Sequence, residues 1–151
     1  MDPIRVAIIG TAKRSSGLYD PILKALPEEV KLVSVWGRSV ESAKKLGNQL
    51  SVPWYLDIDK LIKETSPQVG IVCVGYHANG EVGKMAVDHG LHVLLETPIA
   101  HKLSEADAII QTARQAGIKV EVAEQFHRRP LEQLKLKLIE SGLFGKVYTS
   151  F

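Results

Sequence analysis

Cysteine is almost absent from this chain: Cys73 is the only one among 151 residues. A single cysteine excludes an intrachain disulfide and a zinc site built from several cysteines. Cys73 lies in the apolar run 70–74, where a small buried core residue is the expected role and a reactive thiol is the alternative. The five histidines show no metal-ligand spacing, and no nucleophile motif such as G-x-S-x-G occurs. We therefore expect no metal site.

The chain also lacks an excess of either charge and any long apolar run. Nineteen Lys and Arg residues against 17 Asp and Glu residues give a net charge of +2. No basic tract alternates with aromatic residues, so nucleic acid is not an expected partner. No stretch is long enough to cross a bilayer, and residues 1–5 lack the basic start and apolar core of a signal peptide. These absences predict a cytoplasmic protein that contacts no membrane.

What the chain does have is a regular alternation of strand-like and helix-like segments. Its 151 residues, 45% of them hydrophobic, suit one domain with a sizeable core. Such alternation is typical of right-handed βαβ units. It predicts an α/β fold, a Rossmann-like, doubly wound parallel sheet of about six strands with helices on both faces. The predicted strands are 4–9, 30–36, 52–55, 69–74, 91–95 and 118–122.

Capping residues predict where several helices begin. Ser39 and Asp57 precede helical patterns and suit the N-cap, where a side-chain oxygen accepts a backbone N–H. The segment Ser104–Asp107 has the pattern of a capping box, which predicts a helix start there. Asp20 followed by Pro21 suits an N-cap and a first helical residue, which would start the first helix late.

The first predicted strand runs into a glycine-containing turn that spans residues 10–17. A strand, a tight glycine turn and a helix form the phosphate-binding arrangement of a dinucleotide fold, in which helix-start N–H groups point at the pyrophosphate. The spacing departs from G-x-G-x-x-G, because Ala12 replaces the middle glycine and Gly17 arrives two positions late. The charges and hydroxyls of the loop suit phosphate oxygens, and a solvated basic loop is the alternative. The candidate cofactor-binding residues here are Gly10, Thr11, Ala12, Lys13 and Arg14.

The end of the second predicted strand discriminates between the two nicotinamide cofactors. Folds that bind NAD place an acid there for the adenosine ribose, and this chain has Gly37. Glycine offers no carboxylate to repel a 2′-phosphate, whereas Arg38 and Ser39 can bind one. The sequence therefore favours NADP and leaves NAD possible. In the alternative, Arg38 is a surface residue and Ser39 only a helix cap.

The fifth predicted strand ends abruptly in Glu96-Thr97-Pro98, at the edge where open α/β sheets bind ligands. This segment resembles the Glu-Lys-Pro signature of the Gfo/Idh/MocA family of nicotinamide-dependent oxidoreductases, with Thr97 at the lysine position. The order of elements and strand-end loops matches the family from the first strand to Phe151. In the family the loop lies against the nicotinamide, often with a cis bond before the proline. The lysine is assigned to substrate binding or proton relay, and a threonine has no useful basicity.

The resemblance implies roles for residues at other strand ends. The loop after the fourth strand would contact the nicotinamide ribose, and a helix cap is the alternative for its asparagine. Gln125, His127 and Arg129 would approach the site where the family crosses into its second domain, and His127 is a candidate proton shuttle. The cofactor candidates from these loops are Val74, Gly75, His77, Asn79, Glu96, Thr97 and Gln125, and the catalytic candidates are Thr97 and His127.

The resemblance also implies a parent larger than this chain. Residues 1–125 would form the dinucleotide-binding domain, and residues 126–151 the crossover helix and first strand of a second domain. We expect the chain to be the front part of a longer protein that transfers hydride between a nicotinamide and a secondary alcohol or carbonyl of a sugar, polyol or similar small molecule. Its expected partners are the dinucleotide and, in the full-length parent, that substrate; the resemblance places the usual oligomer interface in the second domain, so a homo-oligomer is left open. A non-catalytic regulatory or scaffold module is the alternative that Thr97 suggests.

Overall fold

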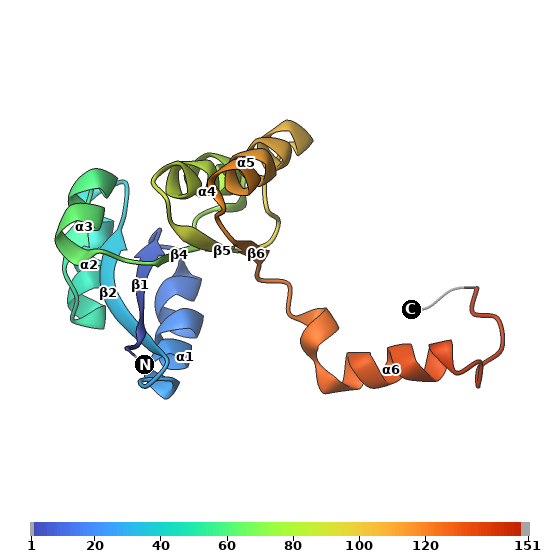
Figure 1. The fold of residues 1–151 in the computed structure, drawn as a ribbon. Coiled ribbons are helices and arrows are strands. Elements are labelled where there is room, and N and C mark those ends of the chain that lie inside the picture. The colour runs from blue at the N-terminus through green and yellow to red at the C-terminus, as the bar shows by residue number, and fades with distance from the viewer. Residues whose placement is uncertain (1, 149–151) are drawn as a thin grey trace.

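The computed structural model describes residues 2–148 as an α/β domain followed by a projecting helix (Figure 1). Six strands form one sheet in the order β3-β2-β1-β4-β5-β6, and every neighbouring pair is parallel. The strands are β1 Ile4–Ile9, β2 Val30–Trp36, β3 Trp54–Tyr55, β4 Val69–Val72, β5 His92–Leu95 and β6 Val120–Val122. This is the predicted Rossmann-like sheet, with its strand order reversing between β1 and β4.

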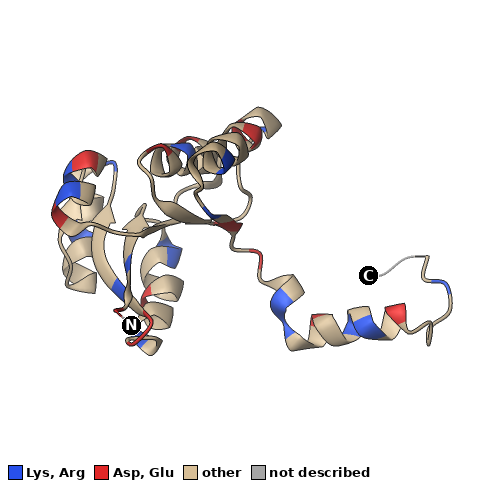
Figure 2. Cartoon of the chain, viewed as in Figure 1, with Lys and Arg blue, Asp and Glu red and all other residues tan. Residues whose placement is uncertain are grey.

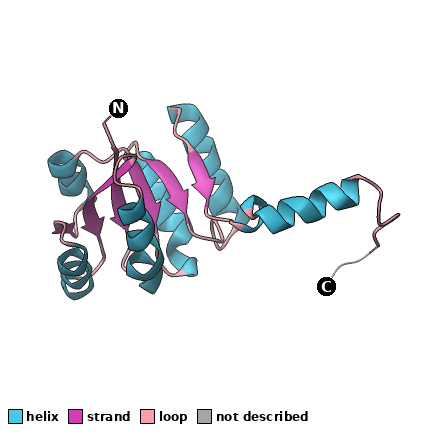
Figure 3. Cartoon of the chain, turned by 90° about the horizontal axis from the view of Figure 1, so that it is seen from below, coloured by secondary structure: helices cyan, strands magenta, loops and turns pink. Residues whose placement is uncertain are grey.

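Helices cover both faces of the sheet, as Figure 3 shows from below. The α-helices are α1 Asp20–Ala25, α2 Val40–Leu50, α3 Ile58–Thr65, α4 Asn79–Asp88, α5 Leu103–Ala116 and α6 Pro130–Glu140. Shorter helical turns are η1 Ser15–Tyr19, η2 Tyr76–Ala78 and η3 Phe126–Arg128. No helix among residues 2–148 is long and apolar enough to cross a membrane.

The alternation of side chains along the strands divides the core into two. Val6 and Ile8 of β1 face one cluster, which contains buried residues of α1 and α2. Ala7 and Ile9 face the opposite cluster, built with α3, α4 and α5. Because successive side chains of a strand point to opposite faces, an apolar strand such as β1 serves both cores at once. Cys73 lies in the first cluster and is 1% exposed, so the expected core role is confirmed.

Two predicted helix caps are confirmed and one is wrong. The Ser39 side chain accepts a hydrogen bond from the Ser42 N–H, and Asp57 accepts one from the Lys60 N–H. Ser104 is not a cap, because the backbone is already helical at Leu103 and the residue before it has the extended conformation of an N-cap. The serine hydroxyl therefore sits inside the first turn of α5.

The first helix also begins earlier than Asp20-Pro21 predicts. Lys13 and Arg14 are already helical, and η1 and α1 continue from them. Pro21 has no N–H to donate within the helix. The helix widens into a π turn before it, in which the Asp20 N–H bonds to the Ser15 carbonyl. The proline is therefore accommodated inside a helix rather than at its start.

The C-terminal segment only partly follows the prediction. Pro130 begins α6 as expected, and this helix projects away from the sheet with charged residues along it (Figures 1 and 2). Lys146–Tyr148 forms no strand in the structure, although one was predicted from residue 146 onward; residues 149–151 lie outside the described residues. A strand gains its hydrogen bonds only from a neighbour, and no described strand lies beside this one. At the other edge, β3 starts at Trp54 rather than Val52, since Pro53 has no N–H for the ladder.

Candidate dinucleotide site

Seven of the fourteen predicted cofactor residues meet at the carboxyl ends of β1, β2 and β4, beside the point where the strand order reverses. A cavity of about 320 Å³ lies there. It is lined by Gly10, Thr11, Ala12, Trp36, Arg38, Ser39, Ser42, Val74, Gly75 and Ala78. Loops that are far apart in sequence, after β1, β2 and β4, thus share one hollow, which is where doubly wound sheets bind ligands.

Gly10 is required by the geometry of the turn. Its φ is +121°, a conformation that side chains rarely adopt, and a Cβ atom there would collide with the Cys73 carbonyl and the Val74 side chain. The Gly10 N–H donates to the Trp36 carbonyl at 2.8 Å, which ties the turn to the end of β2. The chain then enters the helix at Lys13, and the first turn of a helix has backbone N–H groups without an intrahelical acceptor. This turn fits a dinucleotide diphosphate.

The residue at the last glycine position of the phosphate motif is Ser15, not Gly17. Ser15 lies five residues after Gly10, is fully buried, and donates its hydroxyl to the Gly10 carbonyl at 3.2 Å. Gly17 is exposed, and a Cβ there would meet nothing within 4 Å. The expectation that the last glycine arrives late is therefore wrong. The spacing Gly10, Ala12, Ser15 keeps the normal motif with small residues where close packing is needed.

A second hollow of about 500 Å³ adjoins the first. It lies between α2 and the turn of residues 10–17, which we call the phosphate turn. Both hollows share Thr11, Ala12, Ser39 and Ser42. Lys13, Ser16, Lys45 and Glu41 also line this hollow, so two ammonium groups, several hydroxyls and one carboxylate surround it. Ser42 and Lys45 were not among the predicted residues, although their spacing from Ser39 on a predicted helix, at three and six residues, was the available signal.

Gly37 is closely packed against the phosphate turn and α2. A Cβ atom there would lie 2.9 Å from the Thr11 methyl and 3.1 Å from the Ala43 Cβ. An acid at this position would therefore disturb both α2 and the phosphate turn. Arg38 follows at the rim, where its Nη2 lies 3.0 Å from Glu81 Oε2 of α4. That ion pair is exposed on both sides, 56% for Arg38 and 78% for Glu81.

Asn79 lies beneath the loop that follows β5 instead of lining the hollow. Its side chain is fully buried, and its Nδ2 donates to the carbonyls of Glu96 and Pro98 at 3.0 and 2.7 Å. It begins α4 without a capping hydrogen bond from its own side chain, so its amide holds the loop and does not cap the helix. The Thr97–Pro98 peptide bond is cis, as the resemblance implied, and Thr97 is exposed.

Glu96 is the most buried charged residue at this edge, with 5% of its surface exposed. Arg14 Nη1 lies 2.8 Å from its Oε2, and the Tyr19 hydroxyl donates to its Oε1 at 2.7 Å. Burial, followed by this hydrogen bond to the carboxylate, raises the pKa of Tyr19 above its usual range. Arg14, predicted as a phosphate contact, is thus paired with a residue 82 positions later. No local sequence pattern signals such a pair.

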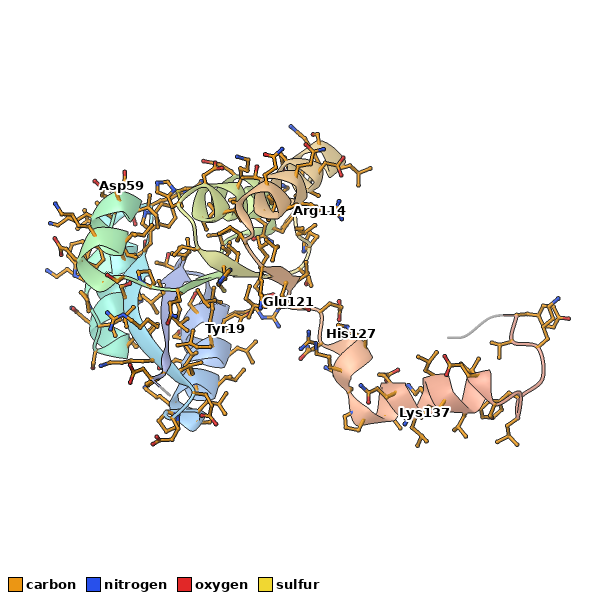
Figure 4. The ribbon with its side chains drawn as sticks, viewed as in Figure 1. Tyr19, Asp59, Arg114, Glu121, His127 and Lys137 are labelled. Atoms are coloured by element: carbon orange, nitrogen blue, oxygen red, sulfur yellow. The ribbon has the colours of Figure 1, made fainter. Side chains whose placement is uncertain are left out.

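The remaining candidates lie around the same edge without joining the first hollow. Gln125 lines a third hollow of about 210 Å³ together with Arg14, Tyr19 and Glu96. His77 is exposed, and its ring packs 4.9 Å from that of His101, centroid to centroid. His127 lies exposed on η3, on the segment that leads away from the sheet to α6 (Figure 4). The structure therefore does not bring His127 to the lining of the described hollows.

Comparison with known proteins settles the family. The Gfo/Idh/MocA model, described as an oxidoreductase family with an NAD-binding Rossmann fold, matches residues 4–124. The chain belongs to the Gfo/Idh/MocA family. Its phosphate turn, switch-point hollow and cis-proline loop are therefore the NAD(P)-binding domain of an oxidoreductase family, and the resemblance drawn from Glu96-Thr97-Pro98 is confirmed.

Curated relatives of this Gfo/Idh/MocA domain are longer proteins. An uncharacterized oxidoreductase of Schizosaccharomyces pombe is 27% identical over 150 residues, which cover 97% of this chain and 40% of the relative. A D-glucoside 3-dehydrogenase of Escherichia coli is also 27% identical, with 98% of this chain and 42% of that protein covered. The chain thus spans about two-fifths of the length of the relatives it matches.

Solved structures share the fold of this Gfo/Idh/MocA domain. The WlbA dehydrogenase of Bordetella pertussis, in complex with NADH and UDP-GlcNAcA, gives a TM-score of 0.87 at 18% identity, covering 97% of this chain and 45% of that one. A 3-ketoreductase of Actinomadura kijaniata, in complex with NADP and TDP-benzene, gives 0.82 at 22% identity, covering 93% and 43%. At these identities the likeness establishes the fold alone.

Proposed function

We propose that this Gfo/Idh/MocA domain prefers NADP over NAD. The observation that carries the proposal is the end of β2, where Gly37 offers no carboxylate to a free ribose hydroxyl and a side chain would require Thr11 and Ala43 to shift. Arg38 and Ser39 line the hollow beside it and supply a guanidinium and a hydroxyl for a 2′-phosphate. The adjoining hollow adds the ammonium groups of Lys13 and Lys45. A strand end that carries no acid of its own, beside these cationic groups, favours the phosphorylated ribose.

Binding of NADPH and NADH to the purified chain tests this preference. Trp36 and Trp54 provide the signal, through quenching and energy transfer to the reduced nicotinamide, because Trp36 itself lines the hollow. We expect NADPH to bind more tightly than NADH. Arg38→Met should weaken the binding of NADPH by about tenfold and change the affinity for NADH little. Equal affinities for both cofactors would contradict the preference, and binding of neither would contradict the dinucleotide site.

We further propose that the parent protein transfers hydride between the nicotinamide of the bound dinucleotide and a secondary alcohol or carbonyl of a sugar, polyol or similar small molecule. Sugar-directed names among the relatives support this substrate class, such as D-glucoside 3-dehydrogenase and levoglucosan dehydrogenase. When bound, the dinucleotide supplies or accepts the hydride; the residues of this chain hold and orient it. We place the dinucleotide-binding domain at residues 1–125, since α6 beyond it exposes Leu131 and Leu134 instead of packing on the sheet.

A non-catalytic nucleotide-binding module is a second candidate, and Thr97 is the observation that favours it. A threonine cannot relay a proton as a lysine of lowered pKa can. Thr97→Lys in the full-length protein discriminates between the two. A large gain in turnover of a polyol substrate supports a degenerate enzyme. Unchanged turnover in a wild-type protein that is already active supports a proton path through another residue. No turnover by either form supports the regulatory module.

A further inference from the structure

We propose that Arg14 is a positioning residue that fixes the loop Glu96–Pro98, and with it the nicotinamide end of the site, to the helix that follows the phosphate turn. This inference rests on the proposed function, because it assigns the loop to the nicotinamide half of a bound dinucleotide. It replaces the role predicted for Arg14 as a direct phosphate ligand.

Both carboxylate oxygens of Glu96 accept hydrogen bonds from the helix that starts in the phosphate turn. Arg14 Nη1 lies 2.8 Å from Oε2, and the Tyr19 hydroxyl lies 2.7 Å from Oε1. The two donors come from one helical segment, residues 13–25, on which Tyr19 is buried (Figure 4). A shift of this helix on binding a diphosphate is therefore transmitted directly to the carboxylate at the end of β5.

The backbone of the loop is held by strand β4 and by the start of α4, which packs in the core cluster opposite that of α1. The Glu96 N–H donates to the Val72 carbonyl at 3.0 Å. Asn79 at the start of α4 donates to the carbonyls of Glu96 and Pro98. These contacts leave Thr97 as the exposed residue between two anchored neighbours. The position of Thr97 thus depends on the anchors of Glu96 and Pro98.

Arg14 is the cation that pairs with Glu96 within the described part of the chain. A carboxylate that is 5% exposed is costly to keep charged without a partner. Without the guanidinium, Glu96 retains only the Tyr19 hydroxyl, and we expect it to move toward water and carry the loop with it. Arg14 itself is half-exposed, at 52% of its side chain, so its removal leaves the two cores intact.

Two probes that differ only in the nicotinamide test this role in the intact 151-residue chain. NADPH carries the nicotinamide and 2′-phospho-ADP-ribose lacks it. For Arg14→Met we expect the Kd of NADPH to rise about tenfold and that of 2′-phospho-ADP-ribose to change less than about twofold. The fluorescence emission of bound NADPH should shift toward that of free NADPH, which a loss of general stability would not produce. Arg14→Lys should restore part of the difference.

Control variants distinguish the loss of the Arg14–Glu96 contact from a general change in charge. Lys84→Met removes one positive charge from the Lys84–Asp88 pair on α4 and should leave both probes unchanged. Arg14→Met combined with Glu96→Gln should bind NADPH better than Arg14→Met alone, because the unpaired buried carboxylate is gone. Should Arg14→Met fail to fold, Tyr19→Phe removes the other hydrogen bond to the Glu96 carboxylate without altering charge. It should weaken the binding of NADPH and leave that of 2′-phospho-ADP-ribose unchanged.

Three outcomes overturn the inference. Equal weakening of both probes by Arg14→Met would make Arg14 a direct phosphate ligand. An unchanged Kd for both probes would show that the Arg14–Glu96 pair has no consequence for the site. Failure of the unmodified chain to bind either probe would overturn the proposed function itself, and this result is separate from the other two.

Discussion

The Arg38–Glu81 pair gives the sharpest prediction about cofactor affinity. The two side chains meet at 3.0 Å across the rim of the first hollow, joining the β2 end to α4. Arg38 cannot bind a 2′-phosphate with the same N–H groups while they are held by Glu81. Glu81→Gln removes this competing carboxylate and preserves the size of the side chain. We therefore expect the variant to bind NADPH more tightly than the unmodified chain.

The size of the gain follows from exposure. Both partners are more than half exposed, and exposed ion pairs are worth about 0–1 kcal/mol. Releasing Arg38 should therefore lower the Kd of NADPH by about two- to fivefold, and not by orders of magnitude. The gain should shrink as salt is raised from about 0.05 to 0.5 M, because salt screens interactions between exposed charges.

Fluorescence titration with NADPH and NADH measures the effect, and two further variants assign it. Glu132→Gln alters a comparable exposed pair, Lys135–Glu132 on α6, and should change neither affinity. In an Arg38→Met background, Glu81→Gln should have no effect, because the arginine it restrains is gone. Weaker NADPH binding by Glu81→Gln, or an equal gain in NADPH affinity with and without Arg38, would contradict this role of Glu81.

Four other predictions concern stability and chemistry. Gly10→Ala should lower the free energy of unfolding by at least about 2 kcal/mol in urea denaturation, since its φ is positive and the added methyl meets the Cys73 carbonyl. Asp57→Ala should lose about 1 kcal/mol by the same measurement, whereas Ser104→Ala should lose little, because only Asp57 accepts a capping bond. Burial raises the pKa of the Cys73 thiol, so iodoacetamide should label it only as the chain unfolds. The pKa values of Tyr19 and Cys73 are both raised by folding, so the folded chain binds more protons in alkali, and stability should fall as the pH rises above about 9 in pH-dependent denaturation.

The sequence predicted those parts of the fold that local chemistry determines. The strands β1 and β2 begin and end at the predicted residues. In a chain that alternates strands and helices, a short apolar run bounded by turn residues forms a buried strand. Ser39 and Asp57 cap their helices as expected for side chains that bond three residues ahead. Ser104 has the same local pattern and fails, since the path of the preceding loop decides where the helix begins.

The candidate site was predicted in its position but not in its internal contacts. The strand-end rule placed Gly10, Arg38 and Gly75 in one hollow without knowledge of any distance. Counting glycines misassigned the last motif position to Gly17, because the requirement there is for a small buried residue, which Ser15 also meets. The Arg14–Glu96 pair joins segments 82 residues apart, and only the packing of the sheet brings them together.

These contacts bear on why a threonine at the lysine position need not disorder the site. The loop that carries Thr97 is held by the Val72 carbonyl, the Asn79 amide and, through Glu96, by Arg14 and Tyr19. None of these anchors involves the side chain at 97. We therefore expect that position 97 can change its chemistry while the backbone around it stays in place, so that a loss of basicity there affects proton transfer in the proposed parent enzyme and not dinucleotide binding. An enzyme and a regulatory module built on this domain would share one binding site, and they would differ at an exposed residue that the fold does not constrain.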